Sequence, residues 1–245
     1  MAAQTYKNAF VTGASQRIGR SLALALAREG IGVAVHFNTN NEAALALVAT
    51  LREIGVRSTA IQADLTSSTI IPAIIEQASR ALGPIDCLIN NAAIWTPSNL
   101  MTLDFQKLIE FSTINTMAPM FLIRAFADQT ENGAVINLLD CRITDYDENN
   151  VAYHLSKRAL SNVTRLAALT LAPQIRVNAI APGLILPPVD GDEAFLRKRR
   201  KTTLLEKTGT VEDVTDAALF LLRSPFITGQ TIFVDGGRNL KGAVY

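Results

Sequence analysis

Short runs of β-branched residues alternate along the chain with longer segments in which apolar residues recur every three or four positions. Strands that alternate with helices require right-handed crossovers, which put parallel strands into one sheet with helices on both faces. The pattern therefore predicts a doubly wound α/β fold with a seven-stranded parallel sheet. The predicted strands are residues 8–12, 33–37, 58–63, 85–90, 134–139, 176–180 and 231–234. The clearest helical segments are 18–28, 43–54, 70–82 and 153–171.

The chain is long and apolar enough to bury one large core. It has 245 residues, of which 49% are hydrophobic, and no repeat or linker-like stretch divides it. We therefore expect a single domain over residues 1–245. Residues 186–208 interrupt the alternation of strand and helix segments with prolines and a basic stretch. We predict that they form a substrate lid. Cys87 and Cys141 are too few for a disulfide framework, so we expect reduced, mostly inert thiols, and we predict no metal site.

Charge and hydropathy exclude several classes of function. Lys and Arg number 23 against 22 Asp and Glu, so no strong field attracts nucleic acid or an anionic membrane. The basic run 197–201 is flanked by acidic residues from Asp190 to Glu206, which indicates a solvated helix face. Residues 1–10 do not resemble a signal peptide, and no apolar run reaches the roughly 18 residues that span a bilayer. We expect a cytoplasmic protein whose partner is a small molecule.

The first predicted strand runs directly into a glycine-containing turn and a helix. The turn reads Thr12-Gly13-Ala14-Ser15-Gln16-Arg17-Ile18-Gly19. Gly13 permits a sharp turn, Gly19 lets the helix approach the strand closely, and the free amides of a helix N-terminus attract a pyrophosphate. The turn therefore predicts a Rossmann-type dinucleotide site, although an ordinary strand-to-helix turn has the same pattern. The expected contacts are Gly13, Ser15, Arg17, Ile18 and Gly19.

The end of the second predicted strand favours NADP(H) over NAD. It reads His36-Phe37-Asn38-Thr39-Asn40, with no carboxylate to bind a ribose 2′-hydroxyl. Guanidinium, imidazole, hydroxyl and amide donors bind a 2′-phosphate instead. We predict that Arg17, His36, Asn38 and Thr39 contact that phosphate. For His36 the alternative is a histidine held at the end of a buried strand.

Several motifs, taken together and in order, resemble those of the short-chain dehydrogenase/reductase family over nearly the whole chain. They are the turn 12–19, Asn90-Asn91-Ala92-Ala93, Asn115, Tyr153-His154-Leu155-Ser156-Lys157, Pro182-Gly183 and Asp235-Gly236-Gly237. A tyrosine and a lysine four residues apart lie on one face of a helix, and we expect the cation to lower the phenol pKa from about 10. The resemblance implies that Tyr153 gives a proton to the substrate, that Lys157 holds the nicotinamide ribose, and that Asn115 supports a water path to Lys157. It also implies a homo-oligomer, usually a tetramer.

Other strand ends supply the remaining expected cofactor contacts. Asp64, followed by Leu65, ends the third strand where an adenine amino group would lie, although a helix cap would look the same from the sequence. By resemblance, Asn91 and Ala92 fix the strand ends beside the cofactor. Pro182 and Gly183 likewise shape the loop under the nicotinamide.

Asp140 is the main departure from the family pattern. The family's catalytic serine is expected 13 residues before the tyrosine, and 153 minus 13 gives position 140, without a gap. Either the enzyme is crippled, or its substrate needs a carboxylate where ketone reductases use a hydroxyl. A carboxylate accepts two N–H bonds at once, and pterins and folates present such a paired edge.

The pteridine reductases share this aspartate, and the chain resembles them elsewhere. Common features include Arg17, His36 and the segment 115–119, whereas 181–186 and 235–240 look most like bacterial dihydromonapterin reductases. Trp95 falls where pteridine reductases place an aromatic residue that sandwiches the pterin against the nicotinamide. A tryptophan packed in the core is the alternative.

We therefore predict NADPH-dependent reduction of a dihydropterin of the dihydromonapterin, dihydrobiopterin or dihydrofolate type to its tetrahydro form. The predicted catalytic residues are Asp140, Tyr153, Lys157 and Asn115, and the substrate contacts are Trp95, Asp140 and Tyr153. One alternative is a general carbonyl or 3-oxoacyl reductase. Another is a non-catalytic NADP-binding sensor or scaffold, against which the retention of Tyr153, Lys157 and Asn115 argues. A weaker hypothesis is that one cation of the run 197–201 meets the glutamate tail of a folate.

Overall fold

The sheet of the computed structural model contains all seven predicted strands. The structure describes residues 6–189 and 191–241, so Asp190 and residues 1–5 of the predicted N-terminal segment lie outside the described residues. The strands are all parallel and lie in the order β3-β2-β1-β4-β5-β6-β7. Their bounds are β1 (Asn8–Val11), β2 (Gly32–Phe37), β3 (Ser58–Gln62), β4 (Cys87–Asn90), β5 (Gly133–Leu138), β6 (Ile175–Pro182) and β7 (Thr231–Val234).

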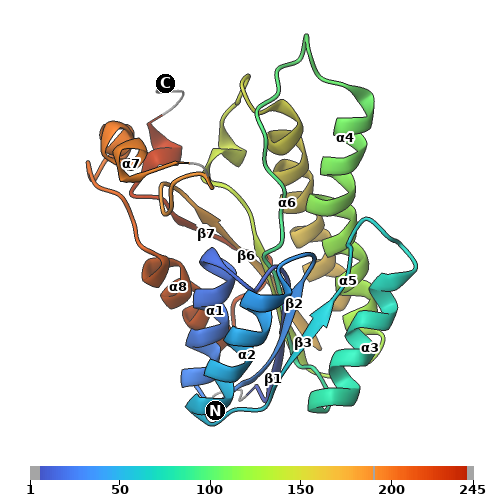
Figure 1. Cartoon of the computed structure of the whole chain (residues 1–245). Helices are drawn as coiled ribbons and strands as arrows, with labels where there is room; N and C mark the ends of the chain where they lie inside the picture. The colour runs from blue at the N-terminus through green and yellow to red at the C-terminus, as the bar shows by residue number, and fades with distance from the viewer. Residues whose placement is uncertain (1–5, 190, 242–245) are drawn as a thin grey trace.

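Helices cover both faces of the sheet, as the sequence predicts (Figure 1). On one face lie α1 (Arg17–Arg28), α2 (Asn41–Ile54) and α8 (Val211–Arg223). On the other lie α3 (Ile70–Leu82), α5 (Ala118–Ala127) and α6 (Val151–Leu171). A further helix, α4 (Phe105–Ser112), continues through a π-helical turn, Thr113–Met117, into α5.

Two large hydrophobic cores result, one on each face of the sheet, and a small third cluster contains Leu139 and Leu160. Successive strand residues point to opposite faces, so Val11 packs beneath α1 and α8 while its neighbour Phe10 packs on the side of α3 and α5. Parallel strands covered on both faces read as nearly continuous apolar runs. This is why the sequence locates the strands well but does not show which face each side chain occupies.

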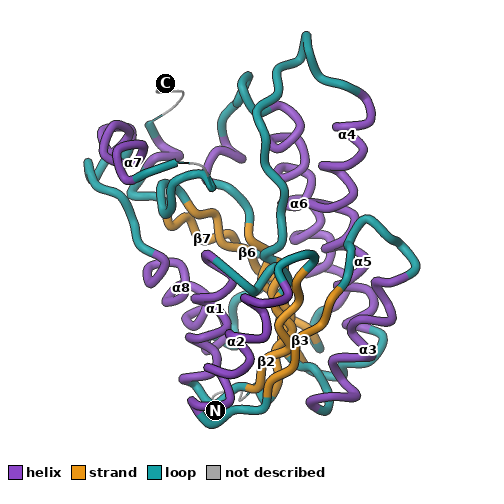
Figure 2. The backbone as a smooth tube through the Cα atoms, in the orientation of Figure 1, coloured by secondary structure: helices purple, strands orange, loops and turns teal. Residues whose placement is uncertain are grey.

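The carboxyl ends of all seven strands lie at one edge of the sheet, because the strands are parallel. The order of strands reverses between β1 and β4, and in doubly wound sheets ligands bind in the crevice at such a point. Many of the residues that line the crevice come from the loops that leave this edge, which are drawn in teal in Figure 2.

The predicted lid contains a short helix and packs against the C-terminal segment. It comprises α7 (Glu193–Arg199) and a 3₁₀ turn, Arg200–Thr202. A second 3₁₀ turn, Arg238–Leu240, follows β7, and Figure 1 shows it beside α7. The amide of Leu205 donates to the carbonyl of Gly236 at 3.2 Å, which ties the two segments together. Among the described residues, no helix is both long and apolar enough to cross a membrane.

Candidate active site

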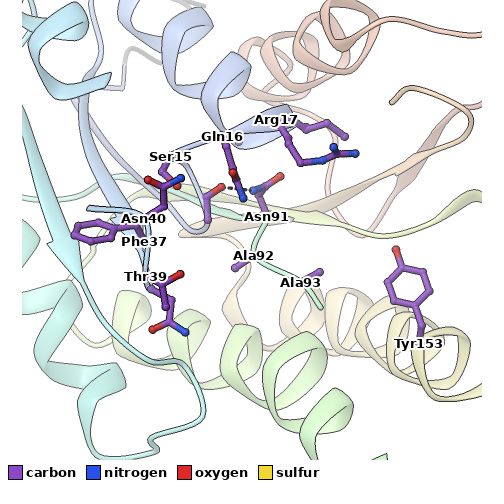
Figure 3. A pocket seen from close by; sticks show the side chains of 14 residues that line it. Ser15, Gln16, Arg17, Phe37, Thr39, Asn40, Asn91, Ala92, Ala93 and Tyr153 are labelled. Atoms are coloured by element: carbon purple, nitrogen blue, oxygen red, sulfur yellow. Dashed lines mark hydrogen bonds between the residues drawn. The ribbon is translucent and has the colours of Figure 1, made fainter. Parts of the chain in front are cut away.

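A first cleft of about 420 Å³ opens at the carboxyl ends of β1 and β2. Figure 3 shows that its walls come from the turn after β1, the loop after β2 and the segment after β4, with Tyr153 at one end. Of the predicted cofactor contacts, the structure places nine at this cleft. They are Gly13, Ser15, Arg17, Ile18, Gly19, Asn38, Thr39, Asn91 and Ala92.

The glycine turn is shaped for the close approach of a ligand to the backbone. Gly13 has φ +58°, a conformation that glycine adopts without strain, and a Cβ on Gly19 would lie 2.3 Å from the Gly13 carbonyl oxygen. The Asn91 amide donates to the carbonyls of Thr12 and Gly13 at 2.9 and 3.0 Å, which braces the turn against the segment after β4. These contacts leave no room for side chains at either glycine.

The N-terminus of α1 is left open to an anion. The cap residue, Gln16, makes no side-chain hydrogen bond to the helix, and the first turn contains no acidic residue. By contrast, α8 closes its own N-terminus with a capping box formed by Thr210 and Asp213. Free amides at the end of a 12-residue helix, beside a glycine cradle, fit the pyrophosphate of a dinucleotide.

His36 does not lie where we expected it, and its predicted contact with a 2′-phosphate is corrected here. Its side chain is 2% exposed, and Nδ1 accepts a hydrogen bond from the Gly13 amide at 3.1 Å. The second ring nitrogen, Nε2, lies 3.1 Å from the Ala63 carbonyl, to which it donates. Burial lowers the pKa of His36 to about 4, so the ring is neutral at physiological pH. His36 therefore supports the glycine turn from beneath the cleft.

Four other predicted cofactor contacts lie away from the first cleft. Asp64 is exposed, and its carboxylate accepts the Thr66 amide at 2.9 Å in a local turn. Leu65 is buried, and Pro182 ends β6 without lining the cleft. Gly183 lines a neighbouring cleft instead, where a Cβ would lie 2.7 Å from the backbone of Asp235.

This second cleft, of about 810 Å³, shares Gln16, Arg17, Ala93 and Tyr153 with the first. Trp95 and Asp140 line it, together with residues of the lid. The Trp95 side chain is 47% exposed, so the alternative of a tryptophan packed in the core is wrong. Arg17 donates to the carbonyl of Pro187 at 2.5 Å and thereby connects the glycine turn to the lid. The two clefts thus meet at Tyr153.

Asp140, Tyr153 and Lys157 converge at this junction. Asp140 follows β5 and starts a 3₁₀ turn, Cys141–Thr144, in which its Oδ1 accepts the Arg142 amide at 2.8 Å. The Tyr153 hydroxyl lies 3.5 Å from Asp140 Oδ2, to which it donates. On the next turn of α6, the buried Lys157 ammonium donates to the Leu138 carbonyl at 2.7 Å and lies 5.8 Å from the centre of the Tyr153 ring.

The charges at this junction differ from our expectation for Tyr153. Burial, followed by the negative charge of Asp140, raises the pKa of Tyr153 well above its ordinary value, whereas we predicted a lowered pKa. We had considered only the charge of the lysine, whereas burial of the phenol and then the charge of Asp140 both disfavour the phenolate. Burial also raises the pKa of Asp140, and it lowers the pKa of Lys157 to about 8. Tyr153 is therefore protonated at neutral pH and is suited to act as an acid.

Asn115 lies in the π-helical turn and clamps two elements together. Its Oδ1 accepts the Ile94 amide at 2.9 Å, and its Nδ2 donates to the Ile94 carbonyl and to the Ser156 hydroxyl, both at 3.0 Å. Ser156 in turn donates to the carbonyl of Tyr153 at 2.7 Å. Asn115 thus fixes the segment that carries Trp95 relative to the helix that carries Tyr153.

Lys157 makes a testable contribution to stability in the unliganded protein. Its pKa falls from about 10.5 to about 8 on folding, so the folded state disfavours the proton. Below pH 8 both the folded and the unfolded protein hold the proton, so the full free-energy cost of burying the charged lysine is present. Between pH 8 and 10.5 only the unfolded chain holds the proton, so the free energy of unfolding rises with pH. We expect Lys157→Met to raise the free energy of unfolding at neutral pH by on the order of 2 kcal/mol, after the lost hydrogen bond is counted. Urea denaturation across this pH range measures the difference, and a gain that does not shrink as pH rises contradicts the assignment.

Several residues at the clefts were not singled out from the sequence. Gln16, Phe37 and Asn40 line the first cleft, and Arg238 lines the second. Arg199 of the basic run 197–201 also lines the second cleft, and the sequence suggested a folate contact for that run only as a weaker hypothesis. Arg238 directly follows the Gly236-Gly237 pair at the carboxyl end of β7, and that position is the signal that would have indicated it. Cys141 is buried beside Asp140, and burial raises the pKa of its thiol. Within the described part of the chain, no group of three or more His, Cys, Asp or Glu side chains is placed to hold a metal ion.

Comparisons with known proteins show the family to which the chain belongs. A family model described as enoyl-(acyl carrier protein) reductase matches residues 13–239. The 3-oxoacyl-[acyl-carrier-protein] reductase FabG of Staphylococcus aureus is 35% identical, over 94% of this chain and 97% of its own length. Pteridine reductase 1 of Leishmania tarentolae is 32% identical, over 96% of this chain and 97% of its own length. The crystal structure of FolM alternative dihydrofolate reductase 1 from Brucella canis, complexed with NADP, has a TM-score of 0.92 and 30% identity, and the match covers 96% of this chain and 94% of that one. The chain therefore belongs to the short-chain dehydrogenase/reductase family.

Proposed function

We propose that this protein reduces a dihydropterin to its tetrahydro form with NADPH. One observation carries the proposal. A partly buried carboxylate, Asp140, stands 3.5 Å from the Tyr153 hydroxyl in a cleft that is also lined by the half-exposed Trp95. A hydrogen-bond acceptor, a proton donor and a flat aromatic surface together match the polar edge and the planar ring of a pterin.

The first cleft is the proposed site of NADPH. The turn from Gly13 to Gly19 and the open N-terminus of α1 would hold the pyrophosphate. Arg17, Asn38 and Thr39 would bind the 2′-phosphate, and Asn91 and Lys157 would position the nicotinamide end. When bound there, NADPH supplies the hydride that reduces the C=N bond of the substrate.

In the second cleft, Asp140 would orient the pterin. An ionised carboxylate accepts two N–H bonds from the amino-pyrimidinone edge of the ring. Burial raises the pKa of Asp140, but the Arg142 amide and the charges of Lys157, Arg238 and Arg142 act in the opposite direction and favour the ionised form. Trp95 would stack on the ring, which contributes about 0.5–1.5 kcal/mol beyond the buried area.

Tyr153 would supply the proton. Its phenol would donate the proton to the nitrogen of the C=N bond, which becomes basic when the neighbouring carbon is reduced. The raised pKa of Tyr153 keeps this proton in place until the substrate demands it. Protonated Lys157, 5.8 Å from the ring centre, then stabilises the phenolate that is left behind.

A 3-oxoacyl or general carbonyl reductase is the second candidate, and the 35% identity to FabG favours it. Asp140 argues against it. The oxygen of a ketone becomes negatively charged during reduction and needs hydrogen-bond donors, whereas an ionised carboxylate can only accept. A pterin edge presents N–H donors and needs hydrogen-bond acceptors, which an ionised Asp140 provides. Asp140 therefore favours a pterin and disfavours a ketone.

Oxidation of NADPH with a panel of substrates tests the proposal. The panel contains 7,8-dihydromonapterin, 7,8-dihydrobiopterin, dihydrofolate, quinonoid dihydropteridine and a 3-oxoacyl thioester. We expect turnover of the 7,8-dihydropterins. Turnover of the thioester alone would exclude the pterin reaction and establish the second candidate.

Arg17 is expected to select NADPH over NADH. Removing its guanidinium in Arg17→Ala takes away a charge-assisted contact to the 2′-phosphate, so the affinity for NADPH should fall about tenfold or more while that for NADH changes little. Fluorescence titration of both coenzymes measures the ratio. An unchanged ratio shows that Arg17 does not read the phosphate.

A further inference from the structure

The second cleft has more positive charge than a neutral pterin requires. Four guanidinium groups line it, those of Arg17, Arg142, Arg199 and Arg238, against the two carboxylates of Asp140 and Asp147. The chain as a whole has a formal charge of only +1, so this excess is local. A local excess of cations in a ligand cleft indicates an anionic group on the ligand.

Two of the four arginines already have a role. Arg142 pairs with Asp147 at 2.8 Å, and Arg17 donates to Pro187 and also lines the first cleft. Arg199 and Arg238 line only the second cleft, and no described acidic residue forms a salt bridge with either of them. These two cations are therefore the ones available to a substrate.

Arg199 is positioned to contact an anionic group of a substrate. Its guanidinium carbon lies 3.8 Å from the centre of the Phe195 ring, one turn earlier on α7, and both side chains line the cleft. Stacking uses the face of the guanidinium, so its N–H donors remain free in the plane to bind a carboxylate. The side chain is only half-buried, which suits a group at the mouth of the cleft.

Arg238 lines the cleft from a different element of the fold. It starts the 3₁₀ turn after β7. Burial raises the pKa of Asp140, and the charge of Arg238 opposes this rise. The segment that contains this turn is tied to the lid through the Leu205–Gly236 hydrogen bond and through Lys241, whose ammonium donates to the Lys201 carbonyl. The two arginines thus belong to two elements that are fixed to each other.

From this arrangement we infer that Arg199 and Arg238 bind an acidic side chain carried by the pterin, so that the cleft selects folate-type substrates over pterins with uncharged side chains. The inference rests on the proposed function. Asp140 and Trp95 bind the pterin ring. The acidic substituent of the ring extends toward the lid, where its carboxylates bind the guanidinium groups of Arg199 and Arg238.

Steady-state kinetics with a graded series of substrates tests the inference. Dihydrofolate carries the two glutamate carboxylates, dihydropteroate carries a single benzoate carboxylate, and 7,8-dihydrobiopterin carries none. In Arg199→Gln we expect KM for dihydrofolate to rise about tenfold, KM for dihydropteroate to rise less, and KM for dihydrobiopterin to stay within about twofold. Added salt should raise KM for dihydrofolate more than KM for dihydrobiopterin.

Arg197→Gln is the matched control. It removes the same charge from the same helix, but Arg197 is exposed and does not line the cleft. Equal effects of the two variants would mean that only the general field of the lid matters, and would overturn the inference. A rise in KM for dihydrobiopterin as large as that for dihydrofolate would also overturn it, because Arg199 would then act through the shape of the lid.

Binding measured without turnover separates this inference from the proposed function. Trp95 is the only tryptophan of the chain and lines the cleft, so quenching of its fluorescence in the complex with NADP⁺ reports on ligand affinity. Selective loss of dihydrofolate affinity in Arg199→Gln supports the anion site even if no pterin is reduced. Reduction of both pterins, without any selective effect of Arg199→Gln or Arg238→Gln, refutes the anion site and leaves the reductase proposal intact.

Discussion

Asp140→Ser is expected to lower kcat/KM for a dihydropterin by about a hundredfold or more, while the affinity for NADPH stays within about twofold. The serine restores the family's usual residue but removes the acceptor of two N–H bonds. The binding of NADPH is spared because Asp140 lines the second cleft and not the first. Initial-rate kinetics with 7,8-dihydrobiopterin and a coenzyme titration measure the two effects.

A companion variant, Asp140→Asn, separates charge from shape. Asparagine keeps the size of the side chain but replaces one acceptor oxygen with a donor, so it should be impaired with pterins almost as strongly as Asp140→Ser. If pterins are turned over at wild-type rates in either variant, Asp140 has no part in the reaction. A gain of ketone reduction in Asp140→Ser alone would show that this position decides between the two substrate classes.

Tyr153→Phe is expected to lower kcat by about 10²–10⁴-fold, the range associated with loss of a positioned general acid. The ring and its packing remain, so the variant should still bind NADPH and quench Trp95 fluorescence on adding a pterin. Single-turnover kinetics measures the loss in the chemical step. A variant that retains most of the wild-type kcat would show that the proton comes from elsewhere.

The pH dependence of the wild-type enzyme should identify the same groups. The raised pKa of Tyr153 means that the phenol stays protonated through the physiological range. Lys157, in contrast, loses its proton as the pH rises through about 8. We therefore expect kcat for reduction to be steady near neutrality and to decline above that point, because neutral Lys157 no longer stabilises the phenolate.

The order of strands and helices could be predicted because parallel strands with both faces buried are uniformly apolar, and these runs stand out between amphipathic helices. The ends were less certain: β6 extends through Pro182, two residues beyond its predicted end, and α6 begins at Val151 and not at Tyr153. Pairing and helix capping, which set these ends, depend on neighbours in space.

The spacing of the motifs was sufficient to predict that Asp140, Tyr153 and Lys157 lie together, and they do so where the two clefts meet. It could not give the direction of each side chain, and this is why His36 was misplaced. His36 follows Val35 and precedes Phe37, which both pack beneath α1 and α2, so it points to the opposite face. Nor could spacing show that burial and the charge of Asp140 would raise the pKa of Tyr153, because both depend on how separate segments pack in space.

The position of His36 has a practical consequence for anyone who wishes to engineer coenzyme preference. Its neutral ring accepts a hydrogen bond from Gly13 and donates one to Ala63, and a pKa of about 4 keeps this arrangement unchanged across the working range of most biocatalysts. Mutant libraries should therefore leave this histidine fixed, together with Asn40, whose side chain caps α2, and vary the exposed Asn38 and Thr39 at the first cleft.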